Sequence, residues 1–345
     1  MKTAVTEIFG CKYPIWLSGM TGISTPELVG AVTNAGGLGI LATADLTMTQ
    51  TREAIRKIRG ITDRPFGANV PLFIPGVAEK AELLLEEKVP VINYTLGSGE
   101  RLIEAVHRYG GKAVATVTNE QHALSAQKYG ADALIVTGHE AAAHGGLITS
   151  MVLIPSIVDV VDIPIIAAGG FADGRGLAAA LALGADGIAM GTRFMNTSES
   201  PAHDNMKHMS NDKKAHETVY SDRIDGLPCR AIDSTGARQL MGDKLYLLKA
   251  LNNSRYAAQA YGFPWIKAVA GLLLAGYSRS RQLARMANAY RAVMLAIHQG
   301  DLEKGVFLMG QATGIIHGTP SVKEVMESIV SEAREAQRNA AEKLG

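Results

Sequence analysis

The fold is decided by the stretch PIIAAGGFADG (residues 164–174). A second stretch, GIAMGTRF (residues 187–194), follows it at a distance that one helix can span. Each stretch is a short apolar run that ends in glycine, a pattern typical of a buried parallel strand. Glycine has no Cβ, so the backbone at these turns can approach a ligand closely. The two turns together therefore predict neighbouring strands with an anion site at their carboxyl ends.

Six more apolar runs precede these two, and helical segments separate them. The candidate strands are Pro14–Leu17, Leu38–Leu41, Gly67–Val70, Val89–Tyr94, Ala113–Thr116, Ala133–Val136, Ile165–Ala168 and Gly187–Met190. The candidate helices are Thr25–Ala35, Met48–Arg59, Gly99–Tyr109, Glu120–Tyr129, Val152–Val161 and Gly174–Leu183. This alternation predicts an α/β protein with a (β/α)8 TIM barrel, and the alternative is an open doubly wound sheet.

The pattern changes after the eighth candidate strand, where strand signals give way to helical ones. We expect a phosphate-binding barrel over residues 1–198, a helical insertion or cap over 199–305, and a return to the barrel over 306–345. Long helices are predicted at Lys244–Tyr261, Ser280–Gln299 and Pro320–Lys343, with a flexible joint or a tight helix contact at Gly271–Tyr277. The alternative is an outer helical layer that has no part in substrate binding. We expect the cap aromatics to shape the substrate pocket, through Tyr256, Tyr261, Phe263 or Trp265.

Composition excludes several classes of protein. Of the 345 residues, 47% are hydrophobic and 19% are charged, and the formal net charge is only +1, so we expect no nucleic-acid partner. The two cysteines, Cys11 and Cys229, cannot build a disulfide framework, and we expect no metal site. The apolar stretch Ala268–Ala275 is shorter than the ~20 residues that span a bilayer, and no signal peptide is recognised. We therefore expect a cytoplasmic protein without a membrane partner.

Phosphate groups in such barrels often bind at the loops after the seventh and eighth strands. Here those loops contain Gly169 and Gly170, then Gly191 and Thr192. Backbone N–H groups at glycine turns attract anions, and the Thr192 hydroxyl can add a donor. These four residues are the predicted phosphate grip.

The same motifs resemble the nitronate monooxygenase (2-nitropropane dioxygenase-like) family. That family includes NADH:quinone reductases and flavin-dependent enoyl-thioester reductases. The resemblance rests on the stretches at 164–174 and 184–194, together with Ser18-Gly19-Met20, Asn34–Gly39, Arg64–Asn69, Glu140 with Ala143-His144-Gly145, and Gly310-Gln311 with Gly314–Ile316.

The resemblance implies FMN as the cofactor. Gly19 and Met20 would lie against the isoalloxazine ring and Asn69 would hydrogen-bond it, while Gln311 approaches from the closing segment. Thr116 and Thr137 stand at strand ends that face the ring; relatives often have a lysine at the first position and some have an acid at the second. Independently of the family, a methionine at a strand end offers a soft apolar surface for a flat ring.

His144 is the candidate catalytic residue. It lies in a loop of small residues after the sixth candidate strand, and histidine titrates near neutral pH, which suits a general base. In the family the histidine of this motif deprotonates a nitroalkane or orients a nitronate. Here Ala142 and Ala143 precede it, where the family commonly has glycine.

The leading hypothesis is an FMN-dependent oxidoreductase of the nitronate monooxygenase type, which oxidises an alkyl nitronate or a related small acid with O2. One alternative is a flavin reductase of quinones or enoyl thioesters that takes electrons from NAD(P)H. A second alternative is a flavin-free barrel that binds a phosphate ligand. In each case the partner is a small molecule, and the helical region offers a surface for a homodimer.

Overall fold

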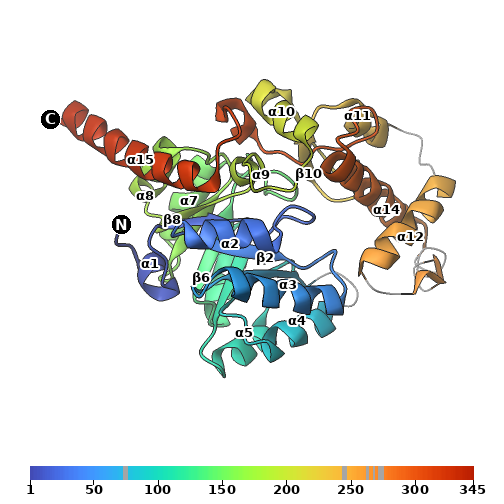
Figure 1. Cartoon of the computed structure of the whole chain (residues 1–345), viewed down its shortest axis with the longest axis horizontal. Helices are drawn as coiled ribbons and strands as arrows, with labels where there is room; N and C mark the ends of the chain where they lie inside the picture. Colours follow the sequence, from blue (N-terminus) through green and yellow to red (C-terminus); the bar gives the residue numbers. More distant parts are fainter. Residues whose placement is uncertain (73–76, 243–246, 262–263, 267–268, 271–275) are drawn as a thin grey trace.

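Eight parallel strands close into a barrel in the computed structural model, which describes the chain except residues 73–76, 243–246, 262–263, 267–268 and 271–275 (Figure 1). The strands pair in chain order, and β8 returns to β1 through Ile15↔Ile188. They are β1 Ile15–Leu17, β2 Leu38–Ala42, β3 Gly67–Pro71, β4 Val91–Thr95, β5 Lys112–Val117, β6 Ala133–Thr137, β7 Ile165–Ala168 and β8 Gly187–Met190. The predicted TIM barrel is confirmed, and the open sheet is wrong.

Helices between the strands cover the outside of the barrel. They are α2 Pro26–Asn34, α3 Met48–Ile61, α4 Val77–Glu86, α5 Glu100–His107, α6 Glu120–Lys128, α7 Ser150–Val158 and α8 Gly174–Ala182. Capping side chains fix where several of them begin: Thr47 and Gln50 form a reciprocal capping box before α3, and Asn119 accepts from the His122 N–H before α6. The predicted helices agree with these bounds to within a few residues.

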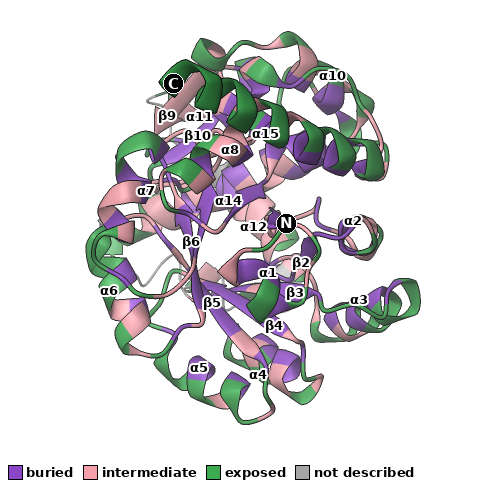
Figure 2. Cartoon of the chain, turned by 90° about the vertical axis from the view of Figure 1, so that its left-hand side faces the viewer, coloured by how far each residue is buried: buried purple, intermediate pink, exposed green. Residues whose placement is uncertain are grey.

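The hydrophobic core has two layers, one between the strands and the helices and one inside the barrel. Figure 2 shows the strands as buried ribbons enclosed by helices whose outer faces are exposed. A short helix, α1 Ala4–Phe9, closes the N-terminal end of the barrel, where Phe9 meets Trp16 edge to face at 4.8 Å between ring centroids. The opposite end, at the carboxyl ends of the strands, is open to a cleft.

Beyond β8 the chain builds a cap beside the open end and then returns. The elements are α9 Thr192–Met195, α10 Asp204–Asp212, η1 Ala215–Glu217, β9 Thr218–Ser221, β10 Cys229–Ile232, α11 Thr235–Met241, α12 Leu247–Tyr261, α14 Gly276–Gln299, η2 Gln311–Ile315 and α15 Val322–Leu344. Helices α12 and α14 pack together on the side of the molecule away from the end of α15, and α15 packs on α8 (Figure 1).

One feature of this region differs from the mainly helical pattern expected from the sequence. Strands β9 and β10 form an antiparallel hairpin, with Arg230 opposite Tyr220. Each strand has only four residues, too few for a clear alternating pattern. Residues 271–275 of the predicted joint lie outside the described residues, and Gly276 begins α14. Among the described helices, none combines the length and the apolar character needed to cross a membrane.

Candidate active site

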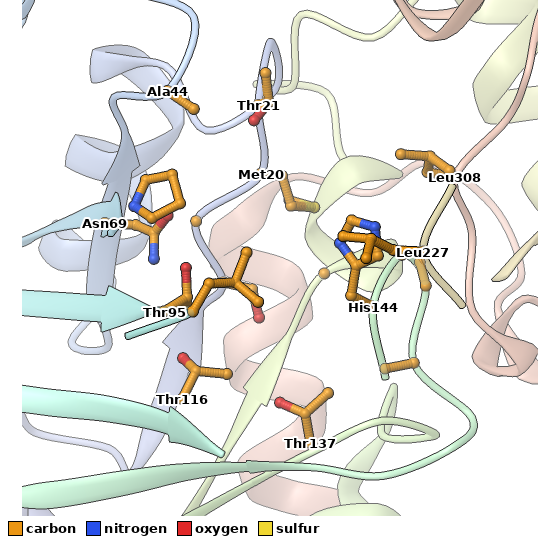
Figure 3. Close-up of a pocket in the computed structure, with 18 of the residues that line it drawn as sticks. Met20, Thr21, Ala44, Asn69, Thr95, Thr116, Thr137, His144, Leu227 and Leu308 are labelled. Atoms are coloured by element: carbon orange, nitrogen blue, oxygen red, sulfur yellow. The ribbon is translucent and has the colours of Figure 1, made fainter. Parts of the chain in front are cut away.

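A cleft of about 1670 Å³ opens over the carboxyl ends of the strands. Its described lining includes all but one of the residues predicted for the site: Gly19, Met20, Asn69, Thr116, Thr137, His144, Gly169, Gly170, Gly191 and Thr192. Figure 3 shows Thr116 and Thr137 on one side of the pocket and Met20 across from them, between Asn69 and His144. The barrel therefore brings to one surface side chains that are spread over 174 positions of the sequence.

Gln311 is the predicted residue outside this lining. It begins η2, and its backbone N–H donates to the Glu140 carbonyl at 2.9 Å, while its neighbours Gly310 and Ala312 line the cleft. The Glu140 carboxylate in turn accepts from the Ser150 N–H at 3.0 Å and from its hydroxyl at 2.9 Å. Glu140 thus ties the closing segment to the loop before α7.

The turn after β7 needs glycine for its backbone conformation. Gly169 and Gly170 have φ of +99° and +84°, a region that residues with a Cβ rarely adopt. A Cβ on Gly169 would also lie 3.0 Å from the Gly138 carbonyl oxygen. The turn leads to α8, whose N-cap Asp173 accepts from the Gly176 N–H. This geometry is suited to a close approach of a phosphate to the backbone.

The turn after β8 is joined to the end of the chain. The Thr192 hydroxyl oxygen accepts from the Gly310 N–H at 3.1 Å, which leaves the Thr192 hydroxyl hydrogen available for a ligand. A Cβ on Gly191 would have only Met20 near it, with Sδ at 3.3 Å. The space over this turn is therefore bounded by the Met20 thioether, and the phosphate grip and the methionine share one wall.

A chain of polar side chains crosses the floor. Asn69 Nδ2 donates to Asn93 Oδ1 at 2.7 Å, and Asn93 Nδ2 donates to Thr116 Oγ1 at 3.0 Å. Asn93 was not predicted, although it lies on the inward face of β4 between Val91 and Thr95. Because Asn69 uses its amide hydrogens on Asn93, its Oδ1 is the atom left to accept from a ligand. A Cβ on Gly19 would lie 2.6 Å from the Asn69 Cβ, so only glycine fits there.

His144 is paired with a carboxylate from the hairpin. Its Nε2 lies 2.8 Å from Asp225 Oδ2, and 37% of its side chain is exposed. Asp225 is fixed by the Leu227 N–H, which donates to Oδ1 at 3.0 Å. A carboxylate accepts hydrogen bonds, so Nε2 is the nitrogen that donates to Asp225, and among the described residues no hydrogen bond is found at Nδ1. Asp225 is 81 residues away in the sequence and was missed.

The loop before His144 and the hairpin form one unit. Ala143 and Arg230 exchange two backbone hydrogen bonds, at 3.1 and 2.9 Å. The Tyr220 hydroxyl donates to the Gly145 carbonyl at 2.7 Å, and Arg230 Nε donates to the His139 carbonyl at 3.0 Å. Ala143 has φ of +54°, which is strained for alanine. The hairpin thus holds the loop in a conformation to which glycine is better suited than alanine.

Cys229 lies beside this pair, and the ligand atoms of His144, Asp225 and Cys229 fall within 4.8 Å of one another. These residue types can bind a metal, a grouping that the sequence did not reveal. However, burial raises the pKa of the Cys229 thiol strongly, and the Asp225 charge raises it further. Metal binding needs the thiolate, so the His144–Asp225 hydrogen bond is the better use of these groups.

A buried lysine fixes the opposite rim. Lys80 on α4 is 4% exposed, and its Nζ donates to the Thr43 and Ala44 carbonyls at 2.9 and 2.7 Å. Burial lowers the pKa of Lys80 to about 8, although the Asp45 carboxylate partly offsets it. Both Lys80 and Ala44 line the cleft, so this contact sets the shape of the rim on the β2 side.

The cap supplies an apolar wall. The large apolar residues of α14 that line the cleft are Leu283, Met286, Tyr290, Val293, Met294 and Ile297, and the same helix adds Ala287, Ala289, Gln282 and Arg279. Of the cap aromatics predicted from the sequence, the two whose side chains the structure describes, Tyr256 and Trp265, do not line the cleft. Tyr256 is 44% exposed and stacks with Arg291, and Trp265 donates from Nε1 to Ser254 Oγ at 2.9 Å. The Tyr261 side chain and Phe263 lie outside the described residues.

A closed parallel barrel with glycine turns after β7 and β8 and a deep cleft at the same end defines a TIM-barrel enzyme. Comparison with known proteins gives the family. A family profile described as nitronate monooxygenase matches residues 2–82 and 73–332. The chain belongs to the nitronate monooxygenase family of oxidoreductases.

Three relatives show how far the likeness extends. A (3aS,4S,5R,7aS)-5-hydroxy-7a-methyl-1-oxo-octahydro-1H-indene-4-carboxyl-CoA dehydrogenase from Rhodococcus jostii is 36% identical, with 96% of each chain covered. A probable nitronate monooxygenase from Staphylococcus saprophyticus is 33% identical over 68% of this chain and 79% of its own. The structure of FabK from Thermotoga maritima superposes with a TM-score of 0.83, at 32% identity and 99% coverage of both chains.

Proposed function

We propose that the chain is an FMN-dependent oxidoreductase that dehydrogenates a bulky, mainly apolar acyl-coenzyme A thioester, with His144 as the base. The observation that carries the proposal is the size and wall of the cleft. At about 1670 Å³ it exceeds the ~300–1,000 Å³ of a usual small-molecule site, and α14 lines it mainly with apolar side chains. It therefore has room for a large substrate beside a cofactor.

The floor of the cleft fits FMN. Gly169, Gly170, Gly191 and Thr192 would hold the phosphate, because their turns leave backbone and hydroxyl donors without a Cβ in the way. Asn69 Oδ1, Thr116 and the Met20 thioether would meet the ring. FMN, when bound, supplies the two-electron redox chemistry that a dehydrogenation needs.

The His144–Asp225 pair gives the proton chemistry. A carbon next to a thioester carbonyl bears a weakly acidic hydrogen, and His144 Nδ1 would receive that proton. Asp225 holds Nε2–H, so it selects the useful tautomer and stabilises the imidazolium that forms. Asp225 is a positioning residue, because it acts through the imidazole.

The relatives support this substrate class. The carboxyl-CoA dehydrogenase matches over 96% of the chain, cap included, whereas the probable nitronate monooxygenase matches over 68%. The nitronate monooxygenase activity predicted from the sequence is the second candidate, favoured by the family profile. A nitroalkane also has an acidic C–H bond, whose proton His144 would accept. A small nitroalkane, however, would fill little of the cleft.

The test is anaerobic reduction of the purified, FMN-loaded protein. We expect bulky alicyclic acyl-coenzyme A thioesters to bleach the flavin absorbance, and expect His144→Ala to slow the bleaching about 10²–10⁴-fold. His107→Ala is the matched control, because His107 forms an equal 2.8 Å contact with Asp132 on the outside of the barrel.

Other outcomes would assign a different reaction. Turnover with alkyl nitronates and O2 alone would establish the nitronate activity. Rapid bleaching by NADH or NADPH, with no reduction by thioesters, would indicate the reductase. A colourless protein that takes up no FMN on titration would indicate the flavin-free barrel.

A further inference from the structure

Charge is distributed very unevenly along this chain. Residues 244–300 contain eight of its 34 basic residues and none of its 33 acidic residues. The rest of the chain, with 26 basic and 33 acidic residues, has a formal charge of −7, and the segment that carries α12 and α14 has +8. A small net charge therefore conceals a strongly cationic cap.

Helix α14 lies along the cleft, with its C-terminal end against the loop after β1 and its N-terminal end away from it. At its inner end Ile297 and Met294 approach Gly22, at 3.2 and 3.4 Å from the position of a Cβ there, in the loop that follows Met20. At its outer end, Arg279 lies on the same cleft-lining face and is exposed. Eighteen residues separate Arg279 from Ile297, which is roughly 27 Å along a helix axis. Between these ends the cleft-lining face is apolar except for Gln282.

The cations at the outer end do not serve helix stability. Arg279 and Arg281 lie in the first two turns of α14, where the helix dipole disfavours positive charge, and no acidic residue lies in the first turn. Arg281 is exposed, as is Arg255 on α12, which packs against α14. An anionic ligand at the N-terminal end of α14 would explain why arginines are concentrated there, where the helix dipole disfavours them.

We propose that Arg279, on the cleft-lining face of α14, binds a phosphate group of the coenzyme A carrier, while the acyl group lies along that face towards Met20. Arg281, two positions further on, points to another side of the helix and adds positive charge at the same end. The proposal rests on the proposed function and adds where the substrate's anionic end is held. Arginine makes strong charge-assisted hydrogen bonds to phosphate, and the cationic cap attracts a polyanion to the cleft. A face that is cationic at one end and mainly apolar along the roughly 27 Å to its other end suits an elongated ligand with one anionic end.

The experiment measures binding of coenzyme A itself by isothermal titration calorimetry to the FMN-loaded protein, at two salt concentrations. We expect Arg279→Glu/Arg281→Glu to weaken binding by about tenfold or more, and to reduce its salt dependence. The matched control is Arg334→Glu/Arg338→Glu, the same charge change on two exposed residues of α15, and it should bind as the unmodified protein does. If the glutamate variant does not fold, Arg279→Gln gives the same comparison.

The proposal is wrong if coenzyme A does not bind the unmodified protein, or if both double variants bind it equally well. It is also wrong if the Arg279 variant loses affinity for NADPH and keeps its affinity for coenzyme A, since the cations would then serve an electron donor. Arg279-dependent binding of coenzyme A without any flavin reduction by acyl-coenzyme A would keep the site and refute the proposed function, so the two failures are distinguishable.

Discussion

The barrel and the cap differ in the residues that build their cleft-lining surfaces and in their charge. The barrel floor is built from backbone turns, glycines and short polar side chains held by a closed sheet, and its sequence carries net negative charge. The cap is helical and cationic, and its inner face is aliphatic. Under the proposed function the rigid barrel would hold the cofactor, whereas the cap would set the size and charge of the substrate. Variants in the two parts should therefore fail in different ways.

The largest effect is expected in the barrel turn. Gly169→Ala should lose most bound FMN, with affinity reduced about 100-fold, because the methyl group would strain the backbone and approach the Gly138 carbonyl at 3.0 Å. Flavin absorbance after gel filtration measures this. The control is Gly110→Ala, whose φ is +78° but whose Cβ would meet no atom within 4 Å. If both variants keep their flavin equally, Gly169 does not belong to the phosphate grip.

The next effect links barrel and cap through the hairpin. Asp225→Asn should lower kcat about 10–100-fold, because an amide can donate to Nε2 and so favour the tautomer in which Nδ1 is protonated. We expect KM, the flavin spectrum and the melting temperature to change little. A general loss of structure would change all three. Asp222→Asn, an exposed carboxylate in the same turn, is the control. Equal kcat in the two variants would remove Asp225 from the mechanism.

A smaller effect should separate the cap from the barrel. Met286→Trp fills the cleft from α14, so KM for bulky thioesters should rise about tenfold while FMN affinity stays the same. Steady-state kinetics with a bulky and a small thioester measures the difference. Tyr256→Trp alters an exposed cap side chain outside the cleft and should leave both values unchanged. An equal rise in KM for both thioesters would show that α14 does not select by size.

The smallest effect is expected at Ala143. Ala143→Gly should raise the free energy of unfolding by about 0.5–1 kcal/mol, since glycine adopts φ of +54° without strain and this outweighs its greater freedom in the unfolded chain. Denaturant unfolding measures it. Ala141→Gly, in the same loop without positive φ, should destabilise instead. Destabilisation by both would mean that the hairpin imposes no strain at Ala143.

The sequence by itself determined the barrel and the phosphate turns. Each strand is a local apolar run bounded by turn residues, and each turn is read from adjacent residues such as Gly169 and Gly170. Sequential βα units must close in chain order, so strand ends that are distant in sequence meet without further information. The same reasoning could have found Asn93, because it lies two positions after Val91 and therefore on the same inward face of β4.

Only the tertiary structure decided how these pieces meet other parts of the chain. The His144–Asp225 contact spans 81 residues and the Thr192–Gly310 contact spans 118, and each depends on a hairpin or segment docking from outside the barrel. The cleft wall likewise depends on which face α14 turns inward. Local periodicity shows that a helix has an apolar face, but what that face meets is fixed by packing, because many surfaces can bury it equally well.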